Sequence, residues 1–574
     1  MINYTLSSGK AHRQFIQFTA EFTTNKSEEL NLQLPAWRPG RYELGNFAKN
    51  IRGFKAFDSK GAALEFRKIT KDKWKIFTTA EALVKVSYEY YAAELNAGST
   101  FLNEKLLYVN PVNCFMYEPE NESEPINVKL DIPDDYILAS PLASSTKKQF
   151  TAKSVHELMD SPFMASDKLQ HHSYSESGCN FHIWVNGEHE LDLEKVEADF
   201  RPFCKAQIED FEGIPVDDYL FLFHFLDQSA YHGVEHEKCT VITLGPASKL
   251  LERAFYEELL GVSSHELYHT WNVKALRPKD MLPYDYSKEN YSELGYVYEG
   301  VTTYMGDWYL LKSNTFSFEQ YAKHVGSYLL RHFHNPGRFK YSVAESSFDT
   351  WLDGYVAGAP GRKTSIYTEG CLIAFISDFR VIKATNGVKN LASVMTELWK
   401  NFGAQGIGYE KEDYFGTLES VAGVSFRDIE ENLVYGTEDF KPYLETALKD
   451  FGLELVFEKH PSAFTANTGF KVASLPTGEY KLLSIAENSP GDISGIHIGD
   501  SITSINGQTN LAKKELDSLD FSNPLKLTIK HLGTSNDIHL NPSLGSHFNM
   551  VKLVKSENPS NEQKHLFNLW CGQI

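Results

Sequence analysis

Two histidines placed one helical turn apart constrain this chain more than any other feature of its sequence. His265 and His269 occur in the segment SSHELYHTWNVK, and Glu266 follows the first of them. On an α-helix, residues i and i+4 share a face, so both imidazoles can bind one metal ion while Glu266 reaches a water molecule beside it. The preceding FYEELLGV has apolar residues at helical spacing, which places the motif where a helix is expected.

A zinc ion in such a site needs a third protein ligand and an open position for water. The downstream segment YVYEGVTTYMGDW has helical spacing and carries Glu299 within an apolar stretch. Burial of a carboxylate there is costly unless it is paired or bound to metal. The sequence therefore predicts that His265, His269 and Glu299 bind zinc, with Glu266 as the general base. The alternative is that the two histidines are packing residues of a half-buried helix.

Two polar residues follow Glu299 on the same predicted helix face. Thr303 and Asp307 lie at i+4 and i+8 from it. Either one of them orients a metal ligand, or both form hydrogen bonds within the helix layer, and the sequence leaves both possibilities open.

A second histidine motif, HGVEH at residues 232–236, has the residue order of an inverted zinc site. It contains a glycine and leads into CTVITLG, which is typical of a strand. A loop that runs into a strand does not hold two histidines on one helix face. We therefore predict that this motif is not the metal site.

Changes in periodicity indicate a multidomain α+β chain. Up to about residue 165, apolar and polar residues alternate, as in RQFIQFTAEF and LVKVSYEYYA, which predicts a β-sandwich. From about 200 to 448, apolar positions recur at helical spacing, and from about 450 short strands return. The 574 residues are enough for several domains with at least one large core.

The composition narrows the possible partners. The net charge is −20, and an acidic chain repels phosphate backbones, so we predict no nucleic-acid partner. The most apolar stretches are too short to span a bilayer and the N-terminus lacks the pattern of a signal peptide, so we predict no membrane association. No cysteines form a CxxC pair, which favours reduced thiols and a cytoplasmic location. The cysteines are Cys114, Cys179, Cys204, Cys239, Cys371 and Cys571.

Beyond the metal motif, HELYHTWNVKALRP followed by YVYEGVTTYMGDW resembles the PDZ-domain-containing glycyl aminopeptidases. These are gluzincin zinc metallopeptidases, distantly related to aminopeptidase N. LPAWRPGRYELGNFAKNIRGFKAFD resembles their N-terminal domain, HGVEHEKC their substrate-side loop and SIYTEGCLIAF the helix of their catalytic tyrosine. The resemblance covers nearly the whole chain. It implies an N-terminal β-sandwich at 1–180, a thermolysin-like, mainly α catalytic domain at 181–448, a PDZ domain at 449–545 and a tail at 546–574 that packs on the body.

The resemblance also implies roles for single residues. The positions that match the family's zinc ligands are His265, His269 and Glu299. Glu266 matches the general base, and Tyr367 matches the tyrosine whose hydroxyl stabilises the oxyanion. Glu235 matches the residue that binds the free α-amino group of the substrate, while His236 either lines the substrate pocket or caps the loop. The chain departs from the family at Ala275, where a basic residue is expected.

Near the C-terminus, NSPGDISGIHIGDSITSINGQ carries the PDZ pattern, with turn residues at the expected places. DFGLELVFE, residues 450–458, either supplies the carboxylate-binding loop and edge strand of this module or braces the catalytic domain. A PDZ domain would bind a peptide or protein as an added strand.

The expected function is that of a zinc-dependent aminopeptidase that releases glycine or alanine from peptides with a free N-terminus. An inactive peptide-binding scaffold is one alternative, although an inactive chain would be free to lose the residues of the site. A zinc endopeptidase is the other, and it would not need Glu235.

Overall fold

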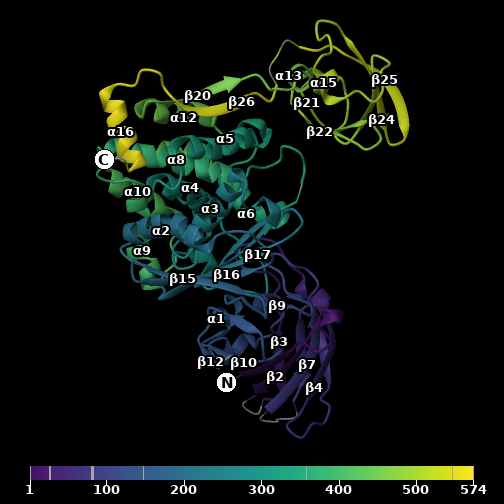
Figure 1. The fold of residues 1–574 in the computed structure, drawn as a ribbon, viewed down its shortest axis with the longest axis vertical. Coiled ribbons are helices and arrows are strands. Elements are labelled where there is room, and N and C mark those ends of the chain that lie inside the picture. The colour runs from purple at the N-terminus through teal and green to yellow at the C-terminus, as the bar shows by residue number, and fades with distance from the viewer. Residues whose placement is uncertain are drawn as a thin grey trace.

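The computed structural model describes residues 2–24, 27–78, 83–146, 148–356, 358–543, 545 and 547–572. Residue 544 of the expected PDZ domain and residues 546, 573 and 574 of the expected tail lie outside these ranges. The chain passes from a β-rich part at the N-terminus through a mainly helical body to a small β-rich lobe (Figure 1). In this form the predicted multidomain α+β architecture is confirmed.

The β-rich part consists of sheets that share one hydrophobic core. The large sheet has the order β12 (Ser144–Thr146), β13 (Gln149–Ala152), β10 (Ile126–Asp131), β1 (Ile2–Ser7), β2 (Phe15–Thr23), β7 (Leu83–Tyr91) and β4 (Ile51–Phe57). One smaller sheet has the order β11 (Ile137–Ala139), β14 (Phe163–Ser166), β9 (Leu106–Val109) and β8 (Phe101–Leu102). Another has the order β3 (Glu29–Gln33), β6 (Lys73–Phe77) and β5 (Phe66–Thr70).

The alternation of apolar and polar residues explains these strands. In β2, Ile16, Phe18, Ala20 and Phe22 are buried, and the residues that alternate with them are more exposed. Successive side chains of a strand point to opposite faces, so this pattern buries one face. The Phe18 ring stacks on Tyr88 of β7 with 4.9 Å between the ring centroids, which joins neighbouring strands within the core.

A mixed sheet lies between the β-rich part and the helices. Its order is β15 (Gln170–Glu176), β16 (Cys179–Asn186), β17 (Asp218–Phe225), β19 (Cys239–Gly245) and β18 (Ala230–Glu235). β16, β17 and β19 are parallel, and β18 lies at the edge, antiparallel to β19. The boundary expected between residues 180 and 181 falls inside β16, because β15 and β16 pair into this sheet.

The body is built around helices that are buried on most sides. α1 (Val155–Met159) lies in the β-rich part, against β13. The helical elements of the body are α2 (Leu193–Asp210), α3 (Arg253–Tyr268), the π-helical turn η7 (Tyr296–Val301), α4 (Thr302–Lys312), α5 (Phe318–His334), α6 (Val343–Phe348), α7 (Thr350–Asp353), α8 (Ile366–Ala384), α9 (Leu391–Asn401), α10 (Lys411–Ala422), α11 (Arg427–Ile429) and α12 (Phe440–Asp450). In α4 every residue from Thr302 to Leu311 is buried. A helix that is buried all round belongs to the centre of a domain, and α4 contacts α3, α5 and α8 there.

The C-terminal lobe has a hydrophobic core of its own. Its antiparallel sheet has the order β21 (Phe470–Ser474), β22 (Tyr480–Ile485), β23 (Ser501–Ile505), β24 (Leu525–His531) and β25 (Thr534–Leu540), with the short helices α13 (Ala463–Thr468), α14 (Pro490–Ile493) and α15 (Lys513–Leu516). Figure 1 shows the lobe to one side of the body, at the opposite end from the N-terminus.

The segment DFGLELVFE does not join the sheet of the lobe. It forms β20 (Leu453–Glu458), which pairs with β26 (Met550–Lys555), and β26 packs against α5. The Phe451 ring stacks on Phe379 of α8 at 4.0 Å. The expectation of a PDZ edge strand is therefore wrong here, and the alternative that the segment braces the body is correct. Alternation identifies a strand, but it does not identify the strand's partner.

The last helix, α16 (Asn561–Cys571), packs against α4, α8 and α12. Trp570 is fully buried, and its indole N–H donates to the Tyr304 hydroxyl at 3.0 Å. The Trp570 carbonyl accepts from the Trp308 indole at 3.0 Å. No helix in the described part of the chain combines the length and apolar character needed to cross a bilayer.

We predict that Trp570→Ala lowers the stability of the helical body by about 3–5 kcal/mol, because it leaves a cavity and removes the indole N–H that donates to the Tyr304 hydroxyl. The measurement is thermal unfolding followed by circular dichroism. His565→Ala, at an exposed position of the same helix, is the control and should change stability little. Equal melting temperatures for the two variants would contradict the role of Trp570.

Candidate metal and catalytic site

The end of α3 and the turn η7 bring the predicted ligands together. His265 lies in the last turn of α3, and His269 follows that helix directly. Their Nε2 atoms are 3.0 Å apart. Glu299 Oε2 lies 3.4 Å from His269 Nε2 and 3.9 Å from His265 Nε2. Two imidazole nitrogens and a carboxylate oxygen thus converge on one point, which is a donor set that suits zinc.

Asn272 positions His269 from behind. The Nδ1–H of His269 donates to the Asn272 carbonyl oxygen at 2.7 Å, and because a carbonyl only accepts, Nε2 keeps its lone pair for a metal. The Asn272 side-chain amide donates to the Val297 carbonyl at 2.9 Å and lies 3.0 Å from the Thr302 hydroxyl. The same residue therefore connects the histidine ligand to the turn that carries Glu299.

A tyrosine of the β-rich part holds the third ligand. The Tyr42 hydroxyl donates to Glu299 Oε1 at 3.0 Å, and both side chains are buried. The segment that carries Tyr42 is fixed by Trp37, whose indole N–H donates to the Asp285 carbonyl at 2.8 Å. Sequence reasoning did not identify Tyr42. It lies within the segment that resembles the family's N-terminal domain, but no spacing links it to a residue 257 positions away.

Glycines allow the helices of the site to approach closely. A Cβ atom added at Gly300 would lie 2.4 Å from the Cα of Gly370, so η7 and α8 touch there through their backbones. A Cβ atom at Gly306 would lie 2.9 Å from the Cα of His265, which gives the same close approach between α4 and α3. Side chains at these glycines would push Glu299 and His265 apart from their partners.

Glu266 faces an edge strand and a cavity. A Cβ atom at Gly233 of β18 would lie 2.1 Å from Glu266 Oε1, so the carboxylate packs directly on the strand backbone. Its Oε2 atom is buried and has no hydrogen-bond partner among the described residues. Burial raises the pKa of Glu266 well above its usual value, and His269 opposes this change. A buried carboxylate with a free oxygen beside the ligands is suited to accept a proton.

Tyr367 lies in the first turn of α8, and it lines the same cavity of about 630 Å³ as His265 and Glu266. Its hydroxyl is 3.3 Å from that of Tyr355, which also accepts a hydrogen bond from the Tyr42 backbone N–H at 3.2 Å. Burial raises the pKa of Tyr367 well above its usual value, so the phenol stays protonated and can donate a hydrogen bond.

Glu235, the last residue of β18, is 3 % exposed and lies beside the ligand set. Glu235, Glu266 and His269 each have a ligand atom within 4.8 Å of the others. A Cβ atom at Gly40 would lie 2.3 Å from Glu235 Oε2, and Gly40 has a φ of +81° that favours glycine. Within the described structure, Glu235 Oε1 is buried without a hydrogen-bond partner. The β-rich part therefore closes the site on this side.

His236 points to a different partner. Its Nδ1 atom is 3.1 Å from Asp160 Oδ1, which also accepts from Lys274 Nζ at 2.7 Å. Asp160 Oδ2 accepts from the backbone N–H of Glu237 at 2.9 Å. The structure thus places His236 in a buried cluster that fixes the end of β18, and it is not one of the residues that line the cavity.

The remaining sequence candidates lie outside the ligand set. The Thr303 hydroxyl donates to the Glu299 carbonyl at 2.8 Å, and Asp307 Oδ2 accepts from Tyr328 at 3.0 Å. Of the two possibilities for these residues, hydrogen bonding within the helix layer is the one observed. His232 and His236 lie on a strand and in the loop after it, as expected for a motif that is not the metal site. Ala275 is half-buried and does not line the cavity.

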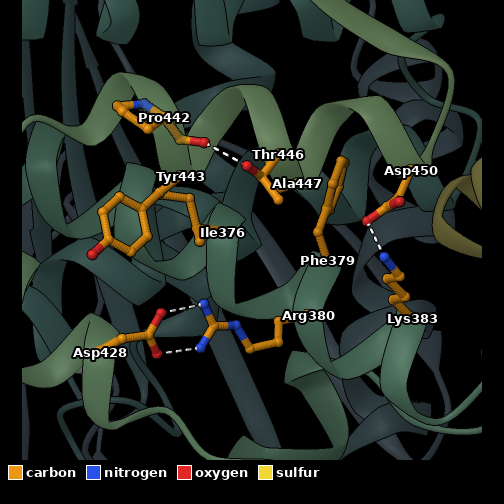
Figure 2. A pocket seen from close by; sticks show the side chains of 10 residues that line it. All are labelled: Ile376, Phe379, Arg380, Lys383, Asp428, Pro442, Tyr443, Thr446, Ala447 and Asp450. Atoms are coloured by element: carbon orange, nitrogen blue, oxygen red, sulfur yellow. Dashed lines mark hydrogen bonds and ion pairs between the residues drawn. The ribbon is translucent and has the colours of Figure 1, made fainter.

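A second cavity, of about 550 Å³, lies between α8, α11 and α12 and contains none of these residues. Figure 2 shows that its charged side chains bind each other, Arg380 to Asp428 and Lys383 to Asp450. Because these charges are satisfied within the protein, they leave no group to recognise a charged ligand.

Comparisons with known proteins agree with this arrangement. Residues 3–167 match the Peptidase M61 N-terminal domain, and residues 258–373 match the M61 glycyl aminopeptidase. The second match contains the predicted ligands and Tyr367. No curated protein matches the sequence. These matches support a peptidase function. The matched residues do not extend to the C-terminal lobe, and the matched descriptions name no metal.

Among solved structures, the chain is similar to an aminopeptidase N family protein from Idiomarina loihiensis, with a TM-score of 0.91, 25 % identity and coverage of 100 % of both chains. It also aligns with an M1 zinc metallopeptidase from Deinococcus radiodurans, with a TM-score of 0.47 and 12 % identity over 74 % of this chain and 90 % of that one. The first likeness extends over every part of the fold, including the lobe.

We predict that Tyr42→Phe weakens zinc binding by about 10–100-fold, because removal of a hydrogen bond to a ligand has this typical effect. The measurement is competition with a chelator at fixed pH. Tyr88→Phe, which removes a buried hydroxyl of the β-rich part bound to the Cys114 carbonyl, is the control. Equal zinc affinity for Tyr42→Phe and the native protein would refute the role of Tyr42.

The buried cluster at Asp160 predicts a pH-dependent stability. Burial alone would raise the pKa of Asp160, but Lys274 and His236 hold it well below its usual value. A depressed pKa stabilises the fold above the unfolded pKa of about 4, and this stabilisation is lost as the pH falls toward the folded value. Asp160→Asn should cost about 3–5 kcal/mol at pH 7, because Lys274 is left buried without a partner.

The measurement is the melting temperature of the native protein and of Asp160→Asn between pH 7 and pH 3. The difference should be largest at neutral pH and should shrink in acid. Adding Lys274→Met to Asp160→Asn should restore part of the loss. A difference that stays constant across this range would show that the ion pair does not contribute in the expected way.

Proposed function

We propose that this chain is a zinc-dependent aminopeptidase that releases small N-terminal residues, glycine or alanine, from peptides. The observation that carries the proposal is the position of Glu235. This carboxylate is buried beside the ligand set, has one oxygen without a partner among the described residues, and packs with the other against Gly40. A buried carboxylate of this kind is suited to bind a cation, and the α-amino group of a peptide is one.

The ligand set fits zinc. His265, His269 and Glu299 supply the two nitrogens and one oxygen that catalytic zinc commonly binds, and Asn272 and Tyr42 hold two of the three in place. When bound, zinc supplies a water of lowered pKa and polarises the substrate carbonyl.

The protein groups then have distinct tasks. Glu266 takes a proton from the attacking water and returns it to the leaving amine. The Tyr367 hydroxyl donates a hydrogen bond to the oxygen that becomes negative as the carbonyl is attacked. Glu235 binds the α-amino group of the first substrate residue, so that the first peptide bond lies beside Glu266.

The closed end beside Glu235 favours an aminopeptidase over an endopeptidase. Gly40 belongs to a segment whose neighbours Trp37 and Tyr42 are both anchored in the body. A chain that continued ahead of the first residue would have to displace this segment. The free oxygens of Glu235 and Glu266 also favour an enzyme over an inactive scaffold, because burying unsatisfied carboxylates is costly unless they act on a substrate.

The substrate preference, the role of the lobe and the location of the protein each have further support. The description of the matched model as a glycyl aminopeptidase supports the preference for a small first residue. The antiparallel sheet of the lobe and the SPG segment at the start of α14 support a PDZ module that binds a peptide or protein. The cysteines are buried and unpaired in the described structure, which supports a cytoplasmic location.

We expect the zinc-loaded protein to hydrolyse glycyl and alanyl amides with a free amino group and to leave their N-acetylated forms uncut. Glu266→Gln should lower kcat by about 10²–10⁴-fold, because the general base is lost while the ligands remain. The measurements are initial rates together with metal content by atomic emission.

Glu252→Gln, at an exposed position just before α3, is the control and should keep both rate and metal content. Equal cleavage of acetylated substrates would favour an endopeptidase. No turnover by zinc-loaded native protein would favour a peptide-binding scaffold.

A further inference from the structure

Three residues of the edge strand β18 indicate how a bound peptide would be oriented. Glu235, Gly233 and Tyr231 are spaced two residues apart, so they lie on the same face of the strand. Glu235 packs against Gly40 beside the ligand set, and Gly233 packs on Glu266. Gly233 and Tyr231 both line the cavity, and Tyr231 is 60 % exposed. A peptide whose amino group lies at Glu235 would therefore pass Glu266 and then extend toward Tyr231, along an edge that is open to an added strand.

The opposite wall of this cavity is one face of α5. Its lining residues are Lys323, His324, Ser327, Tyr328 and Arg331. They recur at helical spacing and extend over eight residue steps, or about 12 Å. The other walls come from α3, α4 and the start of α8. The cavity thus continues beyond Glu266 and Tyr367 into a space between β18 and α5.

Most charges on these walls are already paired. Asp307 accepts from Tyr328 at 3.0 Å and lies 3.7 Å from His324, while Lys323 lies 3.6 Å from Glu257. Arg331 differs, because no carboxylate of the described residues lies within 4.0 Å of its guanidinium. The guanidinium is 5.7 Å from the centre of the Tyr328 ring. Arg331 and Tyr231 line the same cavity.

We propose that Arg331 binds the C-terminal carboxylate of short peptide substrates. A guanidinium matches a carboxylate with two parallel hydrogen bonds, and no carboxylate of the described structure pairs with this one. Glu235 and Tyr231 are four residue steps apart along β18, which is about 13 Å at a strand rise of about 3.3 Å per residue. An extended tripeptide or tetrapeptide covers this length. The site then recognises a short peptide at both charged ends.

Glu258, on the α3 wall, opposes this preference. It lines the same cavity, and its negative charge repels a carboxylate. Discrimination between a free and a blocked C-terminus therefore depends on Arg331 itself and not on a general positive potential of the cavity.

The inference rests on the proposed function, and its test uses two substrates that differ only at the C-terminus. These are Ala-Gly-Gly as the free acid and Ala-Gly-Gly-amide, assayed with the full zinc-loaded chain. For the native protein we expect kcat/KM to be about tenfold higher for the free acid, mainly through KM, because a charge-assisted hydrogen bond is lost with the amide. A length series should peak at three or four residues.

Arg331→Ala should lower kcat/KM for the free acid to that of the amide and leave the amide unchanged. Arg331→Lys should keep part of the preference, because it retains the charge but not the two-pronged geometry. Arg67→Ala, which removes an exposed arginine of β5, is the control and should keep the native ratio.

The outcomes separate this inference from the proposed function. Cleavage of both substrates at equal rates by the native protein would overturn the role of Arg331 while supporting the aminopeptidase. The native ratio in Arg331→Ala would overturn it as well. Cleavage of neither substrate would overturn both proposals.

Discussion

The hydrogen bond from Tyr42 to Glu299 connects the two halves of this molecule at the point where its chemistry would occur. Glu299 is 2 % exposed, and a carboxylate that is removed from water needs partners on every side. The histidines supply them on one side, and Tyr42 supplies one on the other. Because Tyr42 belongs to the β-rich part, that part completes the site and is not an appendage of the helical body.

Glycines give the site its compactness. Gly40 and Gly233 each receive a carboxylate directly on the backbone, and Gly300 meets Gly370 where η7 crosses α8. A methyl group at any of these positions would fill the space that an oxygen or a neighbouring backbone now occupies. Carboxylates packed in this way are shielded from water, so their attraction for a metal or an amino group is stronger than it would be at the surface.

The sequence predicted the parts of the site that depend on local spacing. The i, i+4 relation of His265 and His269 is a property of one helix, and the apolar context of Glu299 marked it as a buried acid. Tyr42 and Tyr355 could not be predicted, because their partners are set by how the β-rich part docks on the body. The same limit explains β20: alternation predicted a strand, but its partner β26 lies almost a hundred residues downstream.

An exposed strand edge is normally a liability, because its free N–H and C=O groups can pair with another chain. Here β18 lies at the edge of its sheet with Glu266 packed on Gly233, and the cavity beside it is bounded by α3 and α5. In the function that we propose, a single extended peptide would lie along this edge. Its amino group would bind at Glu235, and its C-terminal carboxylate would bind at Arg331. Alternate residues of one strand would then specify both the end of the peptide that is cut and the length that fits best.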